Sequence, residues 1–528
     1  MLALSIGPRS AICISPPARY RWPDREEFAI ASRPYSPLLN TLSLNRESSE
    51  SLQDQIANYF RDAVLRGRLS SGSRVPSSRA LASEQGIARI TVVEAYDRLT
   101  AEGYLTARRG AGFFVAAGLS PKLLGQFWAP RAKKHRTSAP ALRRIASLQK
   151  IADRPHHPLA LSLGMPANEQ FPWRTWSRIT QKVYHEHHQE MLCYGDPCGA
   201  LVLRSAISQY LGTARGVDCA PEQVVIVNGS QQGIDLAARA LVDQNEGVWV
   251  EEPGYPMARA AFEMAMLSPV PVPVDNEGMN VELGVKLAPR ARLALVSPSY
   301  QYPLGIKMSL PRRLALIRWA EKNDGWIMEN DYVGEFRYSG APLPPLYTLD
   351  DSGRVLYIGT FSKSLAPSLR LGFVVVPPDL VERFERLKLI ADRQTSVFDQ
   401  YVLARFIQEG HLAAHLRQMR QIYARRRAIL LEALHDEAGD LLEAGNPPEI
   451  GMHLAVKLKC PVDDVLISQR LLKRQIYAAP LSSFYAGDVR ECGFALGFAG
   501  TVETNIRPAV RHLVSAIRDL IGVVSGKS

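Results

Sequence analysis

The stretch from Arg354 to Gly372, RVLYIGTFSKSLAPSLRLG, places a lysine and two hydroxyl side chains directly after an apolar run. The run is typical of a strand that is covered on both faces of a sheet. Lys363 follows it, and a lysine at such a point can form a Schiff base with a carbonyl cofactor. Thr360, Ser362 and Arg370 are suited to hold a phosphate. Taken alone, the pattern fits an ordinary lysine at a strand end equally well.

Four more short apolar runs lie upstream, and segments with helical periodicity separate them. Continuous apolar strands that alternate with helices indicate a mostly parallel sheet covered on both faces. We therefore expect an α/β fold over about residues 158–528. The four runs are Val224–Val227, Gly247–Val250, Leu293–Val296 and Trp326–Met328.

Three segments that follow these strands carry polar side chains, at the strand ends where open α/β sheets place ligands. Asn228–Gly233 opens a helix, whose N-terminal N–H groups can bind phosphate, and Gly229 allows a close approach. Tyr255 could stack on an aromatic ring. Within Glu329–Tyr332, a carboxylate could hydrogen-bond a pyridinium nitrogen. The first two segments also have ordinary explanations, a strand-to-helix turn and a packing tyrosine.

Together these segments resemble the fold-type-I pyridoxal-phosphate aminotransferases over about residues 158–520. The motifs that extend the match are Tyr194–Gly199, Ser297–Gly305, Gly451–His453 and Leu496–Ala499. The resemblance implies that Lys363 is the Schiff-base lysine, Arg370 a phosphate ligand and Tyr255 the ring-stacking residue. The further cofactor-binding residues that it implies are Gly229, Ser230, Gln231, Asn330, Asp331, Tyr332, Thr360 and Ser362.

The chain departs from the aminotransferase pattern at Asn330. Members of that family usually read Glu-Asp-Asp-Tyr here, and the spacing to the lysine assigns the ring nitrogen to the first Asp, where this chain has Asn330. An asparagine can hydrogen-bond the nitrogen but does not stabilise the protonated ring, the electron sink of transamination. We therefore expect cofactor binding with weak or absent transaminase turnover. The pattern leaves open whether Asn330 or Asp331 contacts the nitrogen.

Residues 51–116 follow a different pattern, with three short helices and then two short strands. This is the plan of a winged helix-turn-helix, whose third helix enters the major groove of DNA. We expect the helices around Ile56–Val64, over Arg79–Gln85 with Ser77 or Ser78 as the cap, and over Arg89–Glu102, and the strands at Tyr104–Thr106 and Phe113–Val115.

The same unit resembles the GntR family of regulators through Val75–Ala82, Gly86–Val92 and Ala101–Leu105. Two departures are Ala88, where the family has Ser or Thr, and Phe113, where it has Thr. The expected DNA contacts are Arg79, Arg89, Thr91, Arg108, Arg109 and Gly110. Arginine suits both phosphates and guanine edges. The alternative is that these arginines only solvate a small helical domain.

The formal net charge of +11 is concentrated in the first third of the chain. Residues 1–157 hold 24 basic and 12 acidic side chains, whereas residues 158–528 hold 39 and 40. Residues 117–157 alone hold 9 basic and 1 acidic, so we interpret them as a basic linker that the DNA backbone attracts. A solvated linker without a partner is the alternative. Residues 1–50 are predicted to be a poorly ordered extension.

Composition excludes several classes of protein. The chain has 528 residues of which 46% are hydrophobic, enough for a large core and too many for a disordered tail protein. Six cysteines without CxxC spacing favour a reducing cytoplasm and argue against a metal site. No apolar run approaches the roughly 20 residues of a membrane helix, and no secretory signal is evident.

A winged helix followed by an aminotransferase-like domain resembles the MocR subgroup of GntR regulators. The resemblance implies a homodimer that binds operator DNA and senses pyridoxal phosphate, alone or with a small amino compound. One alternative is an active aminotransferase in which the N-terminal winged helix is vestigial. Asn330 and the DNA-contact arginines argue against it. The other is an inert dimerisation scaffold, against which Lys363 and Arg370 speak.

The sequence does not identify the effector. Arginine usually binds substrate carboxylates, but no arginine closely follows Tyr255 and none lies in Phe494–Gly497. Other arginines, an effector without a carboxylate, and the cofactor alone all remain open.

Overall fold

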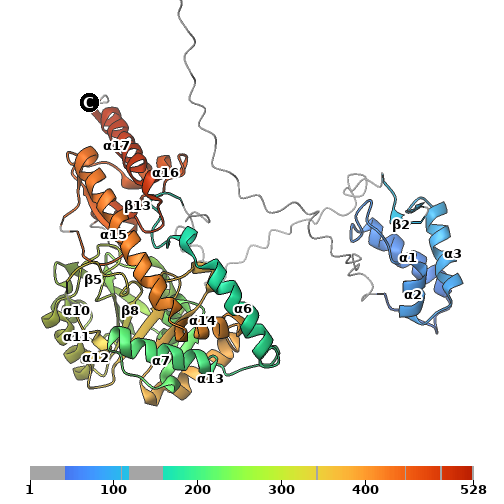
Figure 1. Cartoon of the computed structure of the whole chain (residues 1–528), viewed down its shortest axis with the longest axis horizontal. Helices are drawn as coiled ribbons and strands as arrows, with labels where there is room; N and C mark the ends of the chain where they lie inside the picture. Colours follow the sequence, from blue (N-terminus) through green and yellow to red (C-terminus); the bar gives the residue numbers. More distant parts are fainter. Residues whose placement is uncertain are drawn as a thin grey trace, which may run out of the picture. The chain divides into compact units, whose positions relative to one another are not determined.

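A computed structural model describes residues 42–108, 110–117, 159–340, 343–445, 447–487 and 490–525. The chain divides into two compact units, with the boundary near residue 136, and Figure 1 shows both. Most of the predicted extension over 1–50 lies outside the described residues, as does nearly all of the linker over 117–157 and the predicted DNA contact Arg109.

The small unit is a winged helix-turn-helix, as the sequence predicts. Serine side chains cap its first two helices, since Ser51 accepts a hydrogen bond from the backbone N–H of Asp54 and Ser77 from that of Ala80. The first wing strand runs two residues further than expected, so Arg108 lies on a strand and not in the turn. The elements are α1 (Leu52–Leu65), α2 (Ser78–Gln85), α3 (Arg89–Ala101) and the antiparallel strands β1 (Leu105–Arg108) and β2 (Gly112–Val115).

Tyr96 of α3 lies at the centre of this unit. Its ring is fully buried and contacts Phe60 of α1 and Phe113 of β2 edge-on, with ring centroids 5.4 Å and 5.2 Å away. Its hydroxyl donates a hydrogen bond to the carbonyl of Pro76 at 3.0 Å. Phe113, one of the two departures from the GntR pattern, therefore joins the wing to the helical core.

The large unit is built on an eight-stranded sheet in the order β3-β10-β9-β8-β7-β4-β5-β6. The run from β9 through β8, β7 and β4 to β5 is parallel, whereas β10 and β6 are antiparallel to their neighbours. The mostly parallel sheet is confirmed, although the sequence pattern missed three of its strands. The strands are β3 (Val224–Val227), β4 (Gly247–Glu252), β5 (Ser268–Asp275), β6 (Gly278–Met279), β7 (Leu293–Val296), β8 (Trp326–Asp331), β9 (Val355–Thr360) and β10 (Gly372–Val375).

Helices cover both faces of this sheet. Successive residues of each strand point to opposite sides, so each strand contributes side chains to the packing on both faces. In β9, Tyr357 packs in the core with α7 and α14, while Ile358 packs on the other face with α8, α9 and α13. At the far end of the first face lie α10 and α11 (Figure 1). The helices are α7 (Leu201–Arg215), α8 (Ser230–Leu241), α9 (Pro256–Met264), α10 (Val281–Leu287), α11 (Leu310–Lys322), α12 (Leu346–Leu349), α13 (Val381–Asp392) and α14 (Phe398–Gln408).

The C-terminal part of the large unit contains a second, antiparallel sheet. Its strands are β11 (Leu442–Glu443), β12 (His453–Leu458), β14 (Gly493–Gly497) and β13 (Ala479–Pro480), in that order. The helices around it are α15 (His411–Ala438), α16 (Asp464–Leu472) and α17 (Glu503–Ser525), and α6 (Trp173–His187) packs on α14. Across the described ranges, no helix is long and apolar enough to cross a membrane.

Candidate cofactor pocket and DNA-contact surface

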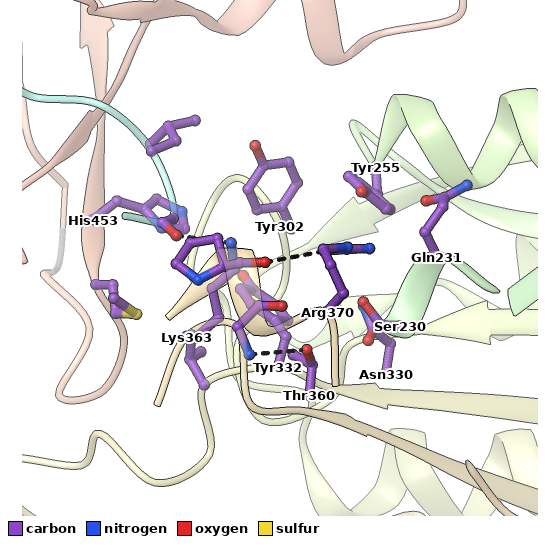
Figure 2. Close-up of a pocket in the computed structure, with 16 residues that line it drawn as sticks. Ser230, Gln231, Tyr255, Tyr302, Asn330, Tyr332, Thr360, Lys363, Arg370 and His453 are labelled. Carbon is purple, nitrogen blue, oxygen red and sulfur yellow. Dashed lines mark hydrogen bonds between the residues drawn. The ribbon is translucent and has the colours of Figure 1, made fainter. Parts of the chain in front are cut away.

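The carboxyl ends of β3, β4, β8 and β9 meet at one edge of the large sheet, because these strands run in the same direction. A cavity of about 190 Å³ lies at this edge, where α/β sheets place ligands (Figure 2). Nine of the predicted cofactor-binding residues line it. They are Ser230, Gln231, Tyr255, Asn330, Tyr332, Thr360, Ser362, Lys363 and Arg370.

Lys363 lies in the turn after β9 and reaches into this pocket. Its Nζ atom donates a hydrogen bond to the carbonyl of Gly164 at 2.7 Å. The position at 164 favours glycine, because its φ of +65° is left-handed and an added Cβ would lie 2.6 Å from Nζ and displace the lysine. A backbone carbonyl therefore helps to hold the Lys363 amino group in the pocket.

Arg370 faces the start of α8 from the other side of the pocket. Its guanidinium donates to the carbonyl of Asn228 at 2.6 Å, and a Cβ at Gly229 would lie 2.8 Å from it. Gly229 itself does not line the pocket, but its lack of a side chain lets the guanidinium approach the N-terminus of α8. An arginine, a helix N-terminus and the hydroxyl-bearing residues Ser230 and Thr360 thus lie along one part of the pocket, and groups of these kinds are suited to bind an anion.

An ion pair between the buried Lys388 and the half-buried Asp392 lies behind Arg370 and the start of α8. Lys388 of α13 is fully buried and donates to Asp392 at 2.5 Å. The other oxygen of Asp392 accepts hydrogen bonds from the side-chain amides of Asn228 and Gln232, both at 2.8 Å. Burial lowers the pKa of Lys388, and the Asp392 carboxylate opposes that shift. Asp392 therefore fixes the loop whose carbonyl holds Arg370.

Strand β8 directs the neighbouring side chains of Asn330 and Asp331 to opposite faces of the sheet. The strand was predicted to end at Met328 but runs to Asp331, so neighbouring residues in it point to opposite faces of the sheet. Asn330 lines the pocket. Asp331 instead pairs with Arg215 of α7 and accepts a hydrogen bond from the Tyr357 hydroxyl at 2.7 Å. Asp331, one of the predicted cofactor-binding residues, therefore does not line the pocket, because its carboxylate contacts Arg215 and Tyr357 on the opposite face.

Three buried polar atoms of the pocket residues have no hydrogen-bond partner within the described part of the chain. They are Oε1 of Gln231, Oδ1 of Asn330 and the hydroxyl of Tyr332. A buried polar atom without a partner is costly and calls for an explanation, of which a bound ligand or ion is one. Their gathering in one cavity with Lys363 and Arg370 indicates a polar ligand that carries an anionic group.

Sequence reasoning matched the motifs that contain Tyr302 and His453 but assigned them no chemistry. Both line the pocket. Burial lowers the pKa of His453 to about 4, so its imidazole is neutral at pH 7. Its Nε2 lies 2.9 Å from the carbonyl of Pro303 and must be the protonated nitrogen, which leaves Nδ1 as an acceptor. The only sequence signal for these two residues is that they lie in the matched motifs Ser297–Gly305 and Gly451–His453.

The predicted DNA contacts of the small unit are mostly exposed. Arg79, Arg89, Arg108 and Gly110 are exposed, and Thr91 is half-buried. Arg89 stands at the start of α3, where its Nε donates to the Ser78 hydroxyl at 3.3 Å. Arg108 lies over the ring of Phe114, 4.5 Å from the centroid. The second GntR departure, Ala88, precedes α3 and gives this helix no side-chain cap.

Two family models match the chain. Residues 52–115 match the bacterial regulatory proteins of the gntR family, and residues 159–513 match aminotransferase class I and II. Among solved structures, kynurenine aminotransferase of Pyrococcus horikoshii is 31% identical with a TM-score of 0.63, and covers 75% of this chain and 98% of its own. A multiple substrate aminotransferase of Thermococcus profundus is 30% identical with a TM-score of 0.64, with the same coverage.

Relatives that contain both units extend over most of the chain. The probable rhizopine catabolism regulatory protein MocR of Rhizobium meliloti is 36% identical over 90% of this chain and 95% of its own length. The pyridoxine biosynthesis transcriptional regulator PdxR of Corynebacterium glutamicum is 30% identical over 90% and 98%. With a winged helix of the GntR type joined to an aminotransferase-like unit in one chain, this protein belongs to the MocR-type transcriptional regulators.

Proposed function

We propose that this regulator binds pyridoxal phosphate through a Schiff base at Lys363 and adjusts its affinity for operator DNA accordingly. The observation that carries the proposal is the pocket, which combines Lys363, Arg370 and three unpartnered buried polar atoms. The cofactor supplies an aldehyde that reacts with primary amines and a ring that withdraws electrons. The signal would be the cofactor alone or with a small amino compound.

The residues of the pocket fit this cofactor. Arg370, Ser230 and Thr360 supply an anion-binding end for its phosphate, supported by Ser362 and by Gln231 at the start of α8. Lys363 supplies the amine for its aldehyde. Tyr255 offers a ring face, and Asn330 and Tyr332 offer unpartnered polar atoms to the groups on the ring. In Figure 2, Arg370, Ser230 and Gln231 lie on one side of Lys363 and His453 on the other.

A second copy of the chain is the proposed partner of an exposed apolar surface on the large unit. Leu192, Tyr194 and Ile390 are 80%, 77% and 83% exposed. The guanidinium of Arg393, at the end of α13, lies over the Tyr194 ring at 3.9 Å from the centroid, which brings these segments together. Exposed large apolar patches mark interaction sites. The proposed homodimer would present two winged helices to a two-fold operator in the cytoplasm.

Pyridoxal phosphate should change the apparent Kd for operator DNA by about fivefold or more, the lower end of typical coupling between two binding sites. The expected measurement is a fluorescence-anisotropy titration of the full chain with DNA from its own promoter region, with and without the cofactor. An unchanged Kd, although absorbance shows that the cofactor is bound, would contradict the proposal.

The DNA-contact side of the proposal has its own matched pair of variants. Arg89→Ala should weaken operator binding by about 1–3 kcal/mol, because it removes an arginine at the N-terminal end of the recognition helix. Arg66→Ala removes the same charge from the end of α1, where Arg66 pairs with Asp62. It should reduce affinity only through net charge. Equal losses in the two variants would contradict a specific role for Arg89.

The ion pair behind the anion site leads to a further prediction. Asp392→Asn cannot accept hydrogen bonds from Lys388, Asn228 and Gln232 together, so the loop that holds Arg370 should loosen. We expect unfolding free energy to fall by about 3 kcal/mol, as when a buried pair loses one partner. Affinity for pyridoxal phosphate should fall about tenfold, equivalent to one lost charged hydrogen bond. Affinity for pyridoxal, which lacks the phosphate, should change little.

The control for this prediction lies on the same helix. Glu382→Gln removes the exposed pair between Glu382 and Arg386, whose side chains are each 74% exposed. Such pairs contribute little to stability, so this variant should bind both forms of the cofactor like the wild type. If Asp392→Asn weakens pyridoxal and pyridoxal phosphate equally, Asp392 does not act through the phosphate.

A further inference from the structure

The two ends of the cofactor pocket differ in charge. Of the 16 described residues that line it, Lys363 and Arg370 carry the positive charges. Both are committed in the proposed function, Lys363 to the aldehyde of the cofactor and Arg370 to its phosphate. Around His453 the wall consists of uncharged side chains, which are Leu163, Tyr302, Met452 and His453 itself.

An apolar cluster fills the space behind this end of the pocket. Ala479, Leu481, Phe484 and Ala495 form a buried cluster against which Leu163 and Tyr302 pack. The Tyr302 ring contacts that of Phe484 edge-on, with centroids 5.3 Å apart. Ala495 of β14 is fully buried there. At position 495, β14 thus contributes a methyl group and no charge to the cluster on which Tyr302 packs.

The polar groups at this end are neutral. The pKa of His453 is lowered to about 4 by burial, so the ring carries no charge at pH 7. Nδ1 of His453 is its free acceptor position, because Nε2–H donates to Pro303. The Tyr302 ring lies 5.6 Å from the His453 ring, centroid to centroid. Such a wall suits a hydroxyl or an aromatic group, whereas an unpaired carboxylate would lose its hydration without gaining a charged partner.

We propose that the effector of this regulator is a primary amine without a carboxylate, which reacts at the cofactor and rests its remaining atoms on the neutral wall formed by Leu163, Tyr302, Met452 and His453. This inference rests on the proposed function, since the amine reaches the cofactor held at Lys363. Its reaction replaces Lys363 Nζ on the cofactor aldehyde carbon by the amine nitrogen. The carbon–nitrogen double bond to Nζ would be replaced by one to the amine nitrogen. With the Schiff base protonated before and after, the incoming ammonium would give up two protons and Nζ would take up two, leaving Lys363 as an ammonium.

The test compares amines with the amino acids that differ from them by one carboxylate. The pairs are ethanolamine and serine, tyramine and tyrosine, histamine and histidine, and putrescine and ornithine. Each is titrated into the full chain carrying stoichiometric pyridoxal phosphate, with free cofactor as the reference for reaction in solution. Cofactor absorbance reports binding, and operator affinity is measured as a second, independent readout.

In every pair that responds, the amine should act at a concentration about tenfold or more below that of its amino acid, because burying an unpaired charge is unfavourable. An amino acid that binds as tightly as its amine, or the absence of any response to the four amines, would overturn the inference. The failure of the proposed function is distinguishable from either result, because then the protein would not hold the cofactor at all.

A gain-of-charge variant adds a second test. Ala495→Arg should shift the preference toward the amino acid of each pair, since it supplies a cation beside Tyr302 for the carboxylate. Ala495→Leu adds bulk without charge and should not shift it. Should both variants fail to fold, the paired titrations of the wild-type protein still decide the inference.

Discussion

The Lys363→Ala protein is expected to lose covalent binding of pyridoxal phosphate completely. In the wild type, borohydride should fix the cofactor to the chain, because it reduces a Schiff base to a stable amine; in the variant no cofactor should be fixed, since the alanine offers no amine. Cofactor absorbance after gel filtration and the mass of the intact chain measure this directly. Operator affinity without cofactor should match the wild type, and the cofactor should no longer change it.

The control for this variant is Lys457→Ala on β12. Lys457 is half exposed and pairs with Glu491 at 2.7 Å, away from the residues that line the pocket. That variant should keep both covalent binding and the effect of the cofactor on DNA. If Lys363→Ala still retains reducible cofactor, the Schiff base forms at another lysine. If the cofactor still changes the operator affinity of the Lys363→Ala protein without a covalent bond, the response does not depend on Lys363.

The Asn330→Asp protein is expected to gain transaminase turnover that the wild type lacks or shows weakly. Asn330 is the β8 side chain that faces the pocket, and a carboxylate there would stabilise a protonated ring nitrogen. A hydrogen bond to a charged group contributes about 1.5–3 kcal/mol, which corresponds to a rate gain of roughly 10- to 150-fold. The measurement is the rate at which bound pyridoxal phosphate is converted to pyridoxamine phosphate. The amino donor is whichever of the titrated amines and amino acids changes the cofactor absorbance most.

Two further variants separate charge from geometry at this position. Asn330→Ala should weaken cofactor binding without raising turnover, since it removes the hydrogen bond and adds no charge. Asp331→Asn should leave cofactor chemistry unchanged and reduce stability, because Asp331 pairs with the buried Arg215. Wild-type turnover comparable to that of an ordinary aminotransferase would contradict the role assigned to Asn330.

Local sequence was sufficient to predict the parts of the pocket that are adjacent in the chain. Lys363 and its hydroxyl neighbours follow a recognisable apolar run, and Ser230 follows another. Parallel strands bring their carboxyl ends together, so both groups were expected at one edge. The end of β8 was misjudged because Glu329, Asn330 and Asp331 are polar yet fully within the strand, where helices cover both faces.

The contributions that sequence reasoning missed depend on contacts between distant segments. Asp392 reaches Asn228 across 164 positions in the chain, and the ring of Tyr302 meets Phe484 in another part of it. No local pattern distinguishes Asp392 from the exposed acidic residues of α13. His453 lay in a matched motif, but its neutral state follows from burial, which only the packed structure reveals.

The opposite orientations of Asn330 and Asp331 also bear on what a single base change can do to this protein. The structural acid Asp331 secures the strand from behind, so a change at 330 alters chemistry while the scaffold persists. Every asparagine codon becomes an aspartate codon by one nucleotide substitution. A single base change would therefore produce the Asn330→Asp protein while the pair between Asp331 and Arg215 stays in place.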